Sequence, residues 1–334
     1  MQVQEEDKEE EVTSMKRILI VSGATATGKS ALGIRLAKEL DGEIVNADSV
    51  QVYRGLDIGS AKLSLEEQEG VPHHLIDIVD PDQEFTVADF KRKADQLIED
   101  IVSRGKLPIV VGGSTLYIKV LLHGLAPLPA GDESLRDELK AMSLDALQAE
   151  LEVKDPKSYA LIDQKNKRKL IRALESIRQG VSPSELQAEH SFSGLDYSAL
   201  IILLELEREE LYGKINRRAA TMLKSGLVEE TQSLIRDYGS QIAPLQALGY
   251  RQVVEQRTDS NNHPEQNLVE EISKHTRRYA KRQLTFWRNE PGKSSWKCFK
   301  TENLLEIKHL ENVLKKIDQE VHLYRAARIS ICES

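Results

Sequence analysis

The segment RILIVSGATATGKSALGIRLAKEL, residues 17–40, decides the fold of this chain. It begins with an apolar, β-branched run typical of a buried strand and ends with the apolar spacing of a helix. Between them lies the pattern GxxxxGKS/T, which places backbone N–H groups and a helix N-terminus around a phosphate. Lys29 neutralises phosphate charge, and the Ser30 hydroxyl can ligate Mg²⁺. The pattern predicts a polyphosphate site, without identifying ATP, formed by Gly23, Ala24, Thr25, Ala26, Thr27, Gly28, Lys29 and Ser30.

Strands and helices alternate around this motif. Short apolar runs predict strands at residues 42–49, 107–114 and 197–207, and residues 87–105 have a helical pattern. The alternation is typical of an α/β fold, here a P-loop NTPase-like parallel sheet with helices on both faces. From about residue 130 the chain turns to charged helical stretches, which we expect at 132–152, 155–179, 208–237 and 265–290.

These changes of character predict the domain organisation. We expect an acidic, disordered tail at residues 1–14 and a helical tail at 301–334. The catalytic core comprises residues 15–130 and 196–300, and residues 131–195 form a helical insertion within it.

The composition bounds the class of protein. No apolar run approaches the roughly 20 residues that span a bilayer, and the N-terminus resembles neither a signal nor a transit peptide. The two cysteines, Cys298 and Cys332, show no zinc or disulfide spacing, so we expect a cytoplasmic protein. A net charge of −8 argues against a surface uniformly adapted to nucleic acid, so any RNA contact needs local basic patches.

Asp48 follows the second predicted strand. The carboxyl ends of parallel strands line one crevice, so its side chain should face the phosphate site. There it could hold Mg²⁺ through water or accept a proton from a nucleophile; it could also simply cap the next segment. The spacing does not separate a kinase from another transferase with a diphosphate leaving group.

Several ordered motifs together resemble the tRNA dimethylallyltransferase (tRNA isopentenyltransferase) family. They are GATATGKS at 23–30, NADSVQVYRGLDIGSAK at 46–62, VPHHLIDIVDP at 71–81, VVGGSTLYIKVLLHGL at 110–125, ALGYRQ at 247–252 and TRRYAKRQLTFWR at 276–288. The resemblance runs from about Arg17 to Trp296. The C-terminal zinc finger of many eukaryotic relatives is missing, so the chain is more similar to the bacterial type.

The resemblance implies transfer of a dimethylallyl group from dimethylallyl diphosphate to N6 of adenine 37 in tRNAs that read codons beginning with U. The P-loop and Mg²⁺, held by Ser30 and possible at Asp48 through water, would bind the diphosphate. Asp48 would act as general base. Ser114 stands where the family usually has threonine, and Arg218, with Arg217 as the alternative register, matches the arginine that contacts the diphosphate.

Two basic segments, 165–172 and 274–288, suit RNA phosphates, and the second interleaves aromatic residues that could stack on bases. The resemblance implies that the partner is the anticodon stem-loop of tRNA, with adenines at positions 36 to 38, bound by a monomer. The residues implied in this contact are Asp48, Ser49, Val50, Gln51, Ser114, Arg136, Arg168, Lys169, Leu170, Ile171, Arg172, Gln246, Ala247, Leu248, Gly249, Tyr250, Arg251, Lys281, Arg282, Gln283, Leu284, Thr285, Phe286, Trp287 and Arg288.

Three other functions share some of these features. An adenylate isopentenyltransferase acting on free AMP, ADP or ATP would use the same P-loop and acid, but it needs neither a helical insertion nor basic segments. A P-loop small-molecule kinase would consume ATP without a prenyl donor. A non-catalytic RNA-binding protein could keep the fold, and its RNA affinity would survive loss of Asp48.

Overall fold

Two units make up the chain: Met1–Leu122 joined with Leu195–Ser334, and His123–Gly194. The computed structural model describes residues 16–125, 128–129, 131–189, 197–258, 265–289, 297–300 and 326–332. The smaller unit begins before the boundary expected at residue 131. The expected tail at residues 1–14 lies outside the described residues.

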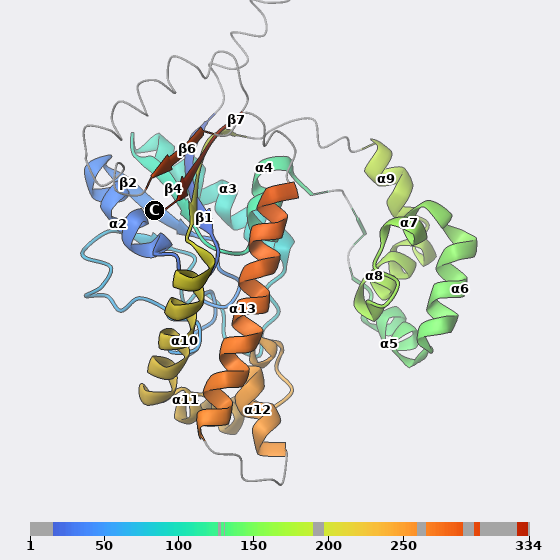
Figure 1. The fold of residues 1–334 in the computed structure, drawn as a ribbon. Helices are drawn as coiled ribbons and strands as arrows, with labels where there is room; N and C mark the ends of the chain where they lie inside the picture. Colours follow the sequence, from blue (N-terminus) through green and yellow to red (C-terminus); the bar gives the residue numbers. More distant parts are fainter. Residues whose placement is uncertain are drawn as a thin grey trace, which may run out of the picture. The chain divides into compact units, whose positions relative to one another are not determined.

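A parallel sheet with the strand order β3-β2-β4-β1-β5-β7-β6 forms the centre of the larger unit (Figure 1). The α/β fold with a parallel sheet is confirmed, and the strands expected around residues 17–22, 42–49, 107–114 and 197–207 are all present. The short strands β3 and β6 were not predicted. The strands are β1 (Arg17–Gly23), β2 (Gly42–Asn46), β3 (His73–His74), β4 (Leu107–Val111), β5 (Ser198–Glu205), β6 (Lys297–Lys300) and β7 (Ala326–Cys332).

Both faces of the central strands β1, β4 and β5 are buried, which explains why these strands are continuous apolar runs. Successive side chains of a strand point to opposite faces. In β1, Ile18 and Ile20 belong to one hydrophobic cluster, which includes α3 (Val87–Ser103) and α4 (Thr115–His123), while Leu19 and Val21 belong to another, which includes α2 (Lys29–Glu39). The sheet therefore has helices on both faces, as the sequence predicts.

Four more helices and a short 3₁₀ turn extend the larger unit beyond the sheet. Their apolar faces pack around Leu227, Tyr250 and Ile272 in a separate cluster, and helices α10 and α13 lie side by side (Figure 1). These elements are α10 (Arg208–Lys224), α11 (Leu227–Tyr238), η1 (Ala243–Gln246), α12 (Tyr250–Thr258) and α13 (Glu265–Asn289).

The prediction of a helical tail over residues 301–334 is wrong for residues 326–332, which form strand β7. Their sequence AARISIC is β-branched at alternate positions, and the strand pairs in parallel with β5, so its backbone groups gain sheet hydrogen bonds. Residues 301–325 lie outside the described part of the chain.

The smaller unit is helical, and its core consists mainly of leucines from three of its helices. Its helices are α5 (Glu133–Ala141), α6 (Leu144–Lys154), α7 (Pro156–Leu161), α8 (Lys167–Arg178) and α9 (Pro183–Glu189). Throughout the described residues, no helix has the length and apolarity needed to cross a membrane.

Candidate active site

The glycine-rich loop joins β1 to the N-terminus of α2, as the motif predicts. Gly23 has φ +143°, and a Cβ there would lie 2.3 Å from the carbonyl oxygen of Leu204 on the neighbouring strand β5. Gly28 precedes the helix in the left-handed conformation, with φ +90°. Only glycine fits both positions, so the loop curls tightly over the strand and turns the first N–H groups of α2 toward a ligand.

Lys29 lies within this loop, and its Nζ donates to the carbonyl oxygen of Ala24 at 2.7 Å. Burial, reinforced by the nearby Arg218 guanidinium, lowers the pKa of the Lys29 ammonium to about 8, although Asp48 acts in the opposite direction. The loop therefore holds a positive charge that lacks a close counter-ion. A bound anion would relieve this imbalance.

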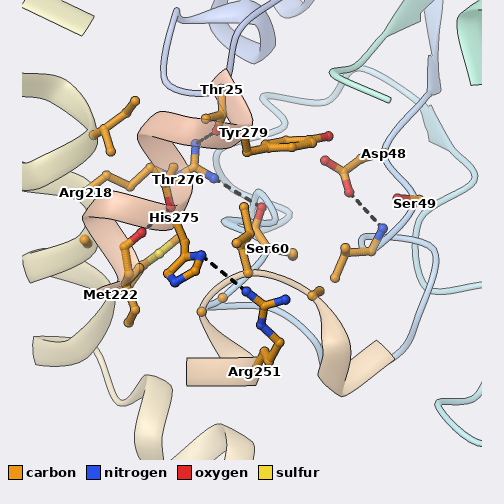
Figure 2. A pocket seen from close by; sticks show the side chains of 18 of the residues that line it. Thr25, Asp48, Ser49, Ser60, Arg218, Met222, Arg251, His275, Thr276 and Tyr279 are labelled. Carbon is orange, nitrogen blue, oxygen red and sulfur yellow. Dashed lines mark hydrogen bonds between the residues drawn. The ribbon is translucent and has the colours of Figure 1, made fainter. Parts of the chain in front are cut away.

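A cavity of about 390 Å³ opens beside the loop, between the carboxyl ends of the strands and helices α10 and α13 (Figure 2). Of the eight P-loop residues, Thr25 alone is among those that line it. The full lining is Thr25, Asp48, Ser49, Val50, Gly59, Ser60, Ser114, Ile215, Arg218, Ala219, Met222, Gln246, Ala247, Leu248, Gly249, Arg251, Ile272, His275, Thr276, Tyr279 and Arg282.

Asp48 lies two residues beyond the end of β2 and lines this cavity. Its Oδ1 accepts the backbone N–H groups of Val50, at 2.8 Å, and Gln51, at 3.3 Å (Figure 2 shows the first). Within the described part of the chain, Oδ2 accepts no hydrogen bond. One oxygen thus fixes the loop in an Asx turn while the other is available to a ligand, so the capping role and the functional role coexist.

Arg218 lines the cavity from α10, whereas Arg217 is exposed and does not. The Arg218 guanidinium donates to Thr25 Oγ1 at 3.4 Å and to the carbonyl oxygen of Ser60 at 3.3 Å. Burial lowers its pKa, partly offset by Asp48, but an arginine remains charged at neutral pH. Arg218 therefore lines the P-loop side of the cavity from α10, and Lys29 adds a second cation within the P-loop motif itself.

Ser114 precedes α4 and contributes its hydroxyl to the cavity. Its backbone N–H donates to the carbonyl oxygen of Ala47 at 3.1 Å, which holds the Ser114 loop against the Asp48 loop. This close approach requires Gly112, because a Cβ there would lie 2.2 Å from the same oxygen of Ala47. The Ser114 hydroxyl makes no hydrogen bond to the described residues, so it is available to a ligand.

Sequence reasoning missed most of one wall of the cavity, formed by α13, of which only Arg282 was among the expected site residues. His275, Thr276, Tyr279 and Arg282 recur at helical spacing and line it together. Burial, and next the Asp48 carboxylate, raise the pKa of the Tyr279 hydroxyl to about 12, so this hydroxyl is neutral at physiological pH. In Figure 2 its ring extends from the helix toward the side of the cavity where Asp48 lies.

Arg251 and His275 pair at another part of the cavity wall, where Arg251 Nη2 donates to His275 Nδ1 at 3.3 Å (Figure 2). A guanidinium can only donate, so Nδ1 is an acceptor and the imidazole carries its proton on Nε2. Apolar side chains from α10 and α13 complete the wall of the cavity: Ile215, Ala219, Met222 and Ile272.

The residues expected to contact RNA lie in three places in the structure: some line the cavity, some are exposed at the surface and some are buried in the core. Gln246, Ala247, Leu248, Gly249, Arg251 and Arg282 line the cavity with Ser49 and Val50. Gln51 instead donates to the carbonyl oxygens of Ser60 and Ala61. Lys281, Thr285 and Arg288 are exposed, while Leu284 and Phe286 are half-buried. The side chains of Tyr250, Gln283 and Trp287 are buried because they face the inner side of their helices, and their contact with RNA stays a prediction.

In the smaller unit, Arg136 and Arg172 bind the fully buried carboxylate of Glu175, each at 2.8 Å. Burial acts to raise the pKa of Glu175, but hydrogen bonds from Arg172, Asp132 N–H and Arg136 outweigh it and lower the pKa. The Leu170 side chain lies in the core of the unit and Ile171 is half-buried, and the RNA contact expected of them stays a prediction. The exposed basic residues of the segment 165–172 are Lys165, Arg168 and Lys169.

Residues 51–290 match the model of the IPP transferase family. This chain belongs to that family. IPP transferases similar to it include tRNA dimethylallyltransferase 1 of Trichlorobacter lovleyi, 45% identical over 282 residues that cover 83% of this chain and 92% of that protein. The tRNA dimethylallyltransferase of Geobacter sulfurreducens is 43% identical over 285 residues, covering 84% and 91%.

Solved structures of other IPP transferases share the fold. The tRNA isopentenylpyrophosphate transferase of Bacillus halodurans has a TM-score of 0.64 and 35% identity, and the match covers 92% of this chain and 98% of that one. A eukaryotic dimethylallyltransferase acting on tRNA has a TM-score of 0.72 and 30% identity, covering 81% and 69%. The predicted family is confirmed.

Proposed function

We propose that this IPP transferase moves a dimethylallyl group from dimethylallyl diphosphate to N6 of adenine 37 in tRNAs that read codons beginning with U. One observation carries the proposal: a single cavity has cationic groups at one side, around Thr25 and Arg218, and the available Oδ2 of Asp48 at another. A diphosphate leaving group and a nucleophile that must lose a proton need this combination.

The diphosphate of the donor binds at the P-loop side. Backbone N–H groups at the start of α2, Lys29 and Arg218 provide the positive charge, and Thr25 and Ser114 provide hydroxyls. Because Lys29 and Arg218 are half-buried and lack a close carboxylate partner, a bound diphosphate interacts with them at a dielectric below that of water. The apolar wall formed by Ile215, Ala219, Met222 and Ile272 accommodates the allyl chain and excludes water.

The adenine enters from the side of Asp48. Its exocyclic amine is a weak nucleophile because the lone pair is delocalised into the ring. As the bond from N6 to C1 of the allyl group forms and the bond from C1 to the diphosphate oxygen breaks, Asp48 Oδ2 accepts the N6 proton. The products are the prenylated base, a protonated Asp48 and free diphosphate, so the atoms and charges balance.

Mg²⁺ fits the donors at this site. The described residues contain no group of three or more acidic, histidine or cysteine side chains that could hold a metal ion. Proteins commonly bind Mg²⁺ through one or two side-chain oxygens together with substrate phosphates and water. The Ser30 hydroxyl would hold it, with Asp48 through water. When bound, the ion neutralises charge that develops on the departing diphosphate.

The acceptor is proposed to be the anticodon stem-loop of tRNA rather than a free nucleotide. The relatives described above are named as tRNA enzymes. A single nucleotide would not need additional basic residues on the surface, whereas tRNA would use Arg168, Lys169 and Lys281, which are exposed. A base inside a folded loop must leave its stack to reach Asp48.

The test is transfer of a labelled dimethylallyl group to an unmodified tRNA with adenines at positions 36 to 38. Mass spectrometry of the digested tRNA should show the added group on one adenosine, and a tRNA without adenine 37 should remain unlabelled. Transfer to AMP or ATP but not to tRNA would favour the adenylate isopentenyltransferase instead. Hydrolysis of ATP without a prenyl donor would favour a kinase.

A further inference from the structure

Gln283 of helix α13 connects two loops of the active site. Its Oε1 accepts the backbone N–H of Thr25 in the P-loop at 2.9 Å, and its Nε2 donates to the carbonyl oxygen of Gly113 at 2.7 Å. The side chain is only 3% exposed. A buried amide whose donor and acceptor each bind a different loop fixes the separation of those loops.

The bridge reaches the general base as well. Gly113 adjoins Ser114, whose N–H donates to the carbonyl oxygen of Ala47, the residue before Asp48. The P-loop, the Ser114 hydroxyl and the Asp48 loop are therefore linked in one chain of hydrogen bonds through Gln283. Gly113 leaves the space for this contact, since a Cβ there would lie 2.6 Å from Gln283 Nε2.

The same helix turns basic side chains outward at this point. Lys281 and Arg282 are exposed, whereas Ala280, Gln283 and Trp287 are buried at the spacing of one helix face. Gln283 therefore lies in a basic segment but faces the catalytic loops instead of the surface.

We propose that Gln283 is a positioning residue, which holds the P-loop and the Ser114 loop in the spacing that binds the donor diphosphate. It acts through Thr25 and Gly113 and does not touch the RNA. The inference rests on the proposed function in naming that diphosphate as part of the donor.

Gln283→Met tests the inference, because methionine has similar length and can form neither hydrogen bond. The fold should survive, since Ser22 Oγ and the carbonyl oxygen of Gly112 already join the strand ends beneath these loops at 3.0 Å. Ser273→Ala is the matched control: Ser273 is buried on the same helix, and its hydroxyl has no partner among the described residues. Thermal unfolding of each variant reports whether the fold is retained.

Two measurements separate positioning from other roles. Calorimetric titration with inorganic pyrophosphate and Mg²⁺ should give a roughly tenfold weaker Kd for Gln283→Met, the effect of losing one or two hydrogen bonds. Steady-state transfer should show a similar rise in donor KM and a lower kcat, with tRNA KM unchanged. The Ser273→Ala control should match the wild-type protein in every value.

Gly113→Ala disrupts the contact between Gly113 and Gln283 without changing the sequence of α13. It is the test variant if Gln283→Met does not fold. Its donor defect should equal that of Gln283→Met, and the double variant should be no worse than either, because all three lose one shared interaction. Unchanged pyrophosphate affinity, or a rise in tRNA KM alone, overturns the inference. If the wild-type protein binds pyrophosphate but does not prenylate tRNA, the proposed function is refuted, while the positioning role of Gln283 is not.

Discussion

Asp48→Asn separates the chemical role of this residue from its structural one. The carbonyl oxygen of asparagine can still accept the N–H groups of Val50 and Gln51, so the loop should keep its shape. What disappears is the charged oxygen that faces the cavity. General-base catalysis contributes roughly 10²–10⁴ in rate, which corresponds to about 3–5 kcal/mol of barrier. We expect turnover to fall by that factor while tRNA affinity remains close to wild type.

The assay must isolate the chemical step, because product release can limit kcat. Single-turnover transfer with saturating donor, followed by mass spectrometry of the tRNA, does so. The experiment belongs at pH 7 or below. Asp48 raises the pKa of Lys29, so its loss shifts that pKa further down from about 8 and would weaken donor binding at higher pH.

Asp48→Ala provides the comparison, since it removes both the base and the Asx turn. Alanine should cost at least as much turnover as asparagine and also lower the thermal stability, through loss of the two loop hydrogen bonds. If the asparagine variant keeps its single-turnover rate within a few-fold while alanine abolishes it, Asp48 serves the loop and the proposed proton transfer is refuted.

Three further changes test other parts of the site. Because Lys29 titrates near pH 8, raising the pH from 7 to 9 should lower its charged fraction, and with it donor affinity, by roughly tenfold; titration with dimethylallyl diphosphate over this range measures the effect. Met222→Ala should enlarge the cavity at its apolar wall. The kcat/KM for a ten-carbon donor, divided by that for the five-carbon donor, should therefore rise roughly tenfold. Glu175→Gln should destabilise the helical unit by about 2 kcal/mol, because it weakens the charge-assisted hydrogen bonds from Arg136 and Arg172, and a lower unfolding midpoint would show this.

The parts of the fold that could be predicted are those where local pattern and burial agree. In β1 and β5 both faces are buried, so the strands appear as unbroken apolar runs, and the glycine motif can only be a tight turn before a helix. Strand β3 was missed because two residues carry no periodicity. Strand β7 was missed because its structure depends on pairing with the distant strand β5, which composition does not reveal.

The candidate site likewise contains residues that the sequence could predict and residues that it could not. Thr25, Asp48, Ser114 and Arg218 belong to motifs, and the structure brings them to one cavity. Most of the α13 wall was not found because a helix face that lines a cavity has the same spacing as one that packs in a core. Within residues 281–288 the basic composition suggested an RNA surface, but composition does not say which way each side chain turns. The helical period does, and it turns Gln283 inward.

The charges of the site explain why its two sides must be held apart. Burial lowers the pKa of both Lys29 and Arg218, and the Arg218 guanidinium lowers the pKa of Lys29 further, so positive charge is costly on the P-loop side of the cavity. A diphosphate restores the balance there, and as it leaves it takes the electrons of the broken bond toward those cations. The proton travels the opposite way, to Asp48. Between them the allyl carbon is electron-poor, and water would capture it. The apolar side chains of α10 and α13 line this part of the cavity, and a fixed spacing of the loops keeps the adenine amine as the nearest nucleophile.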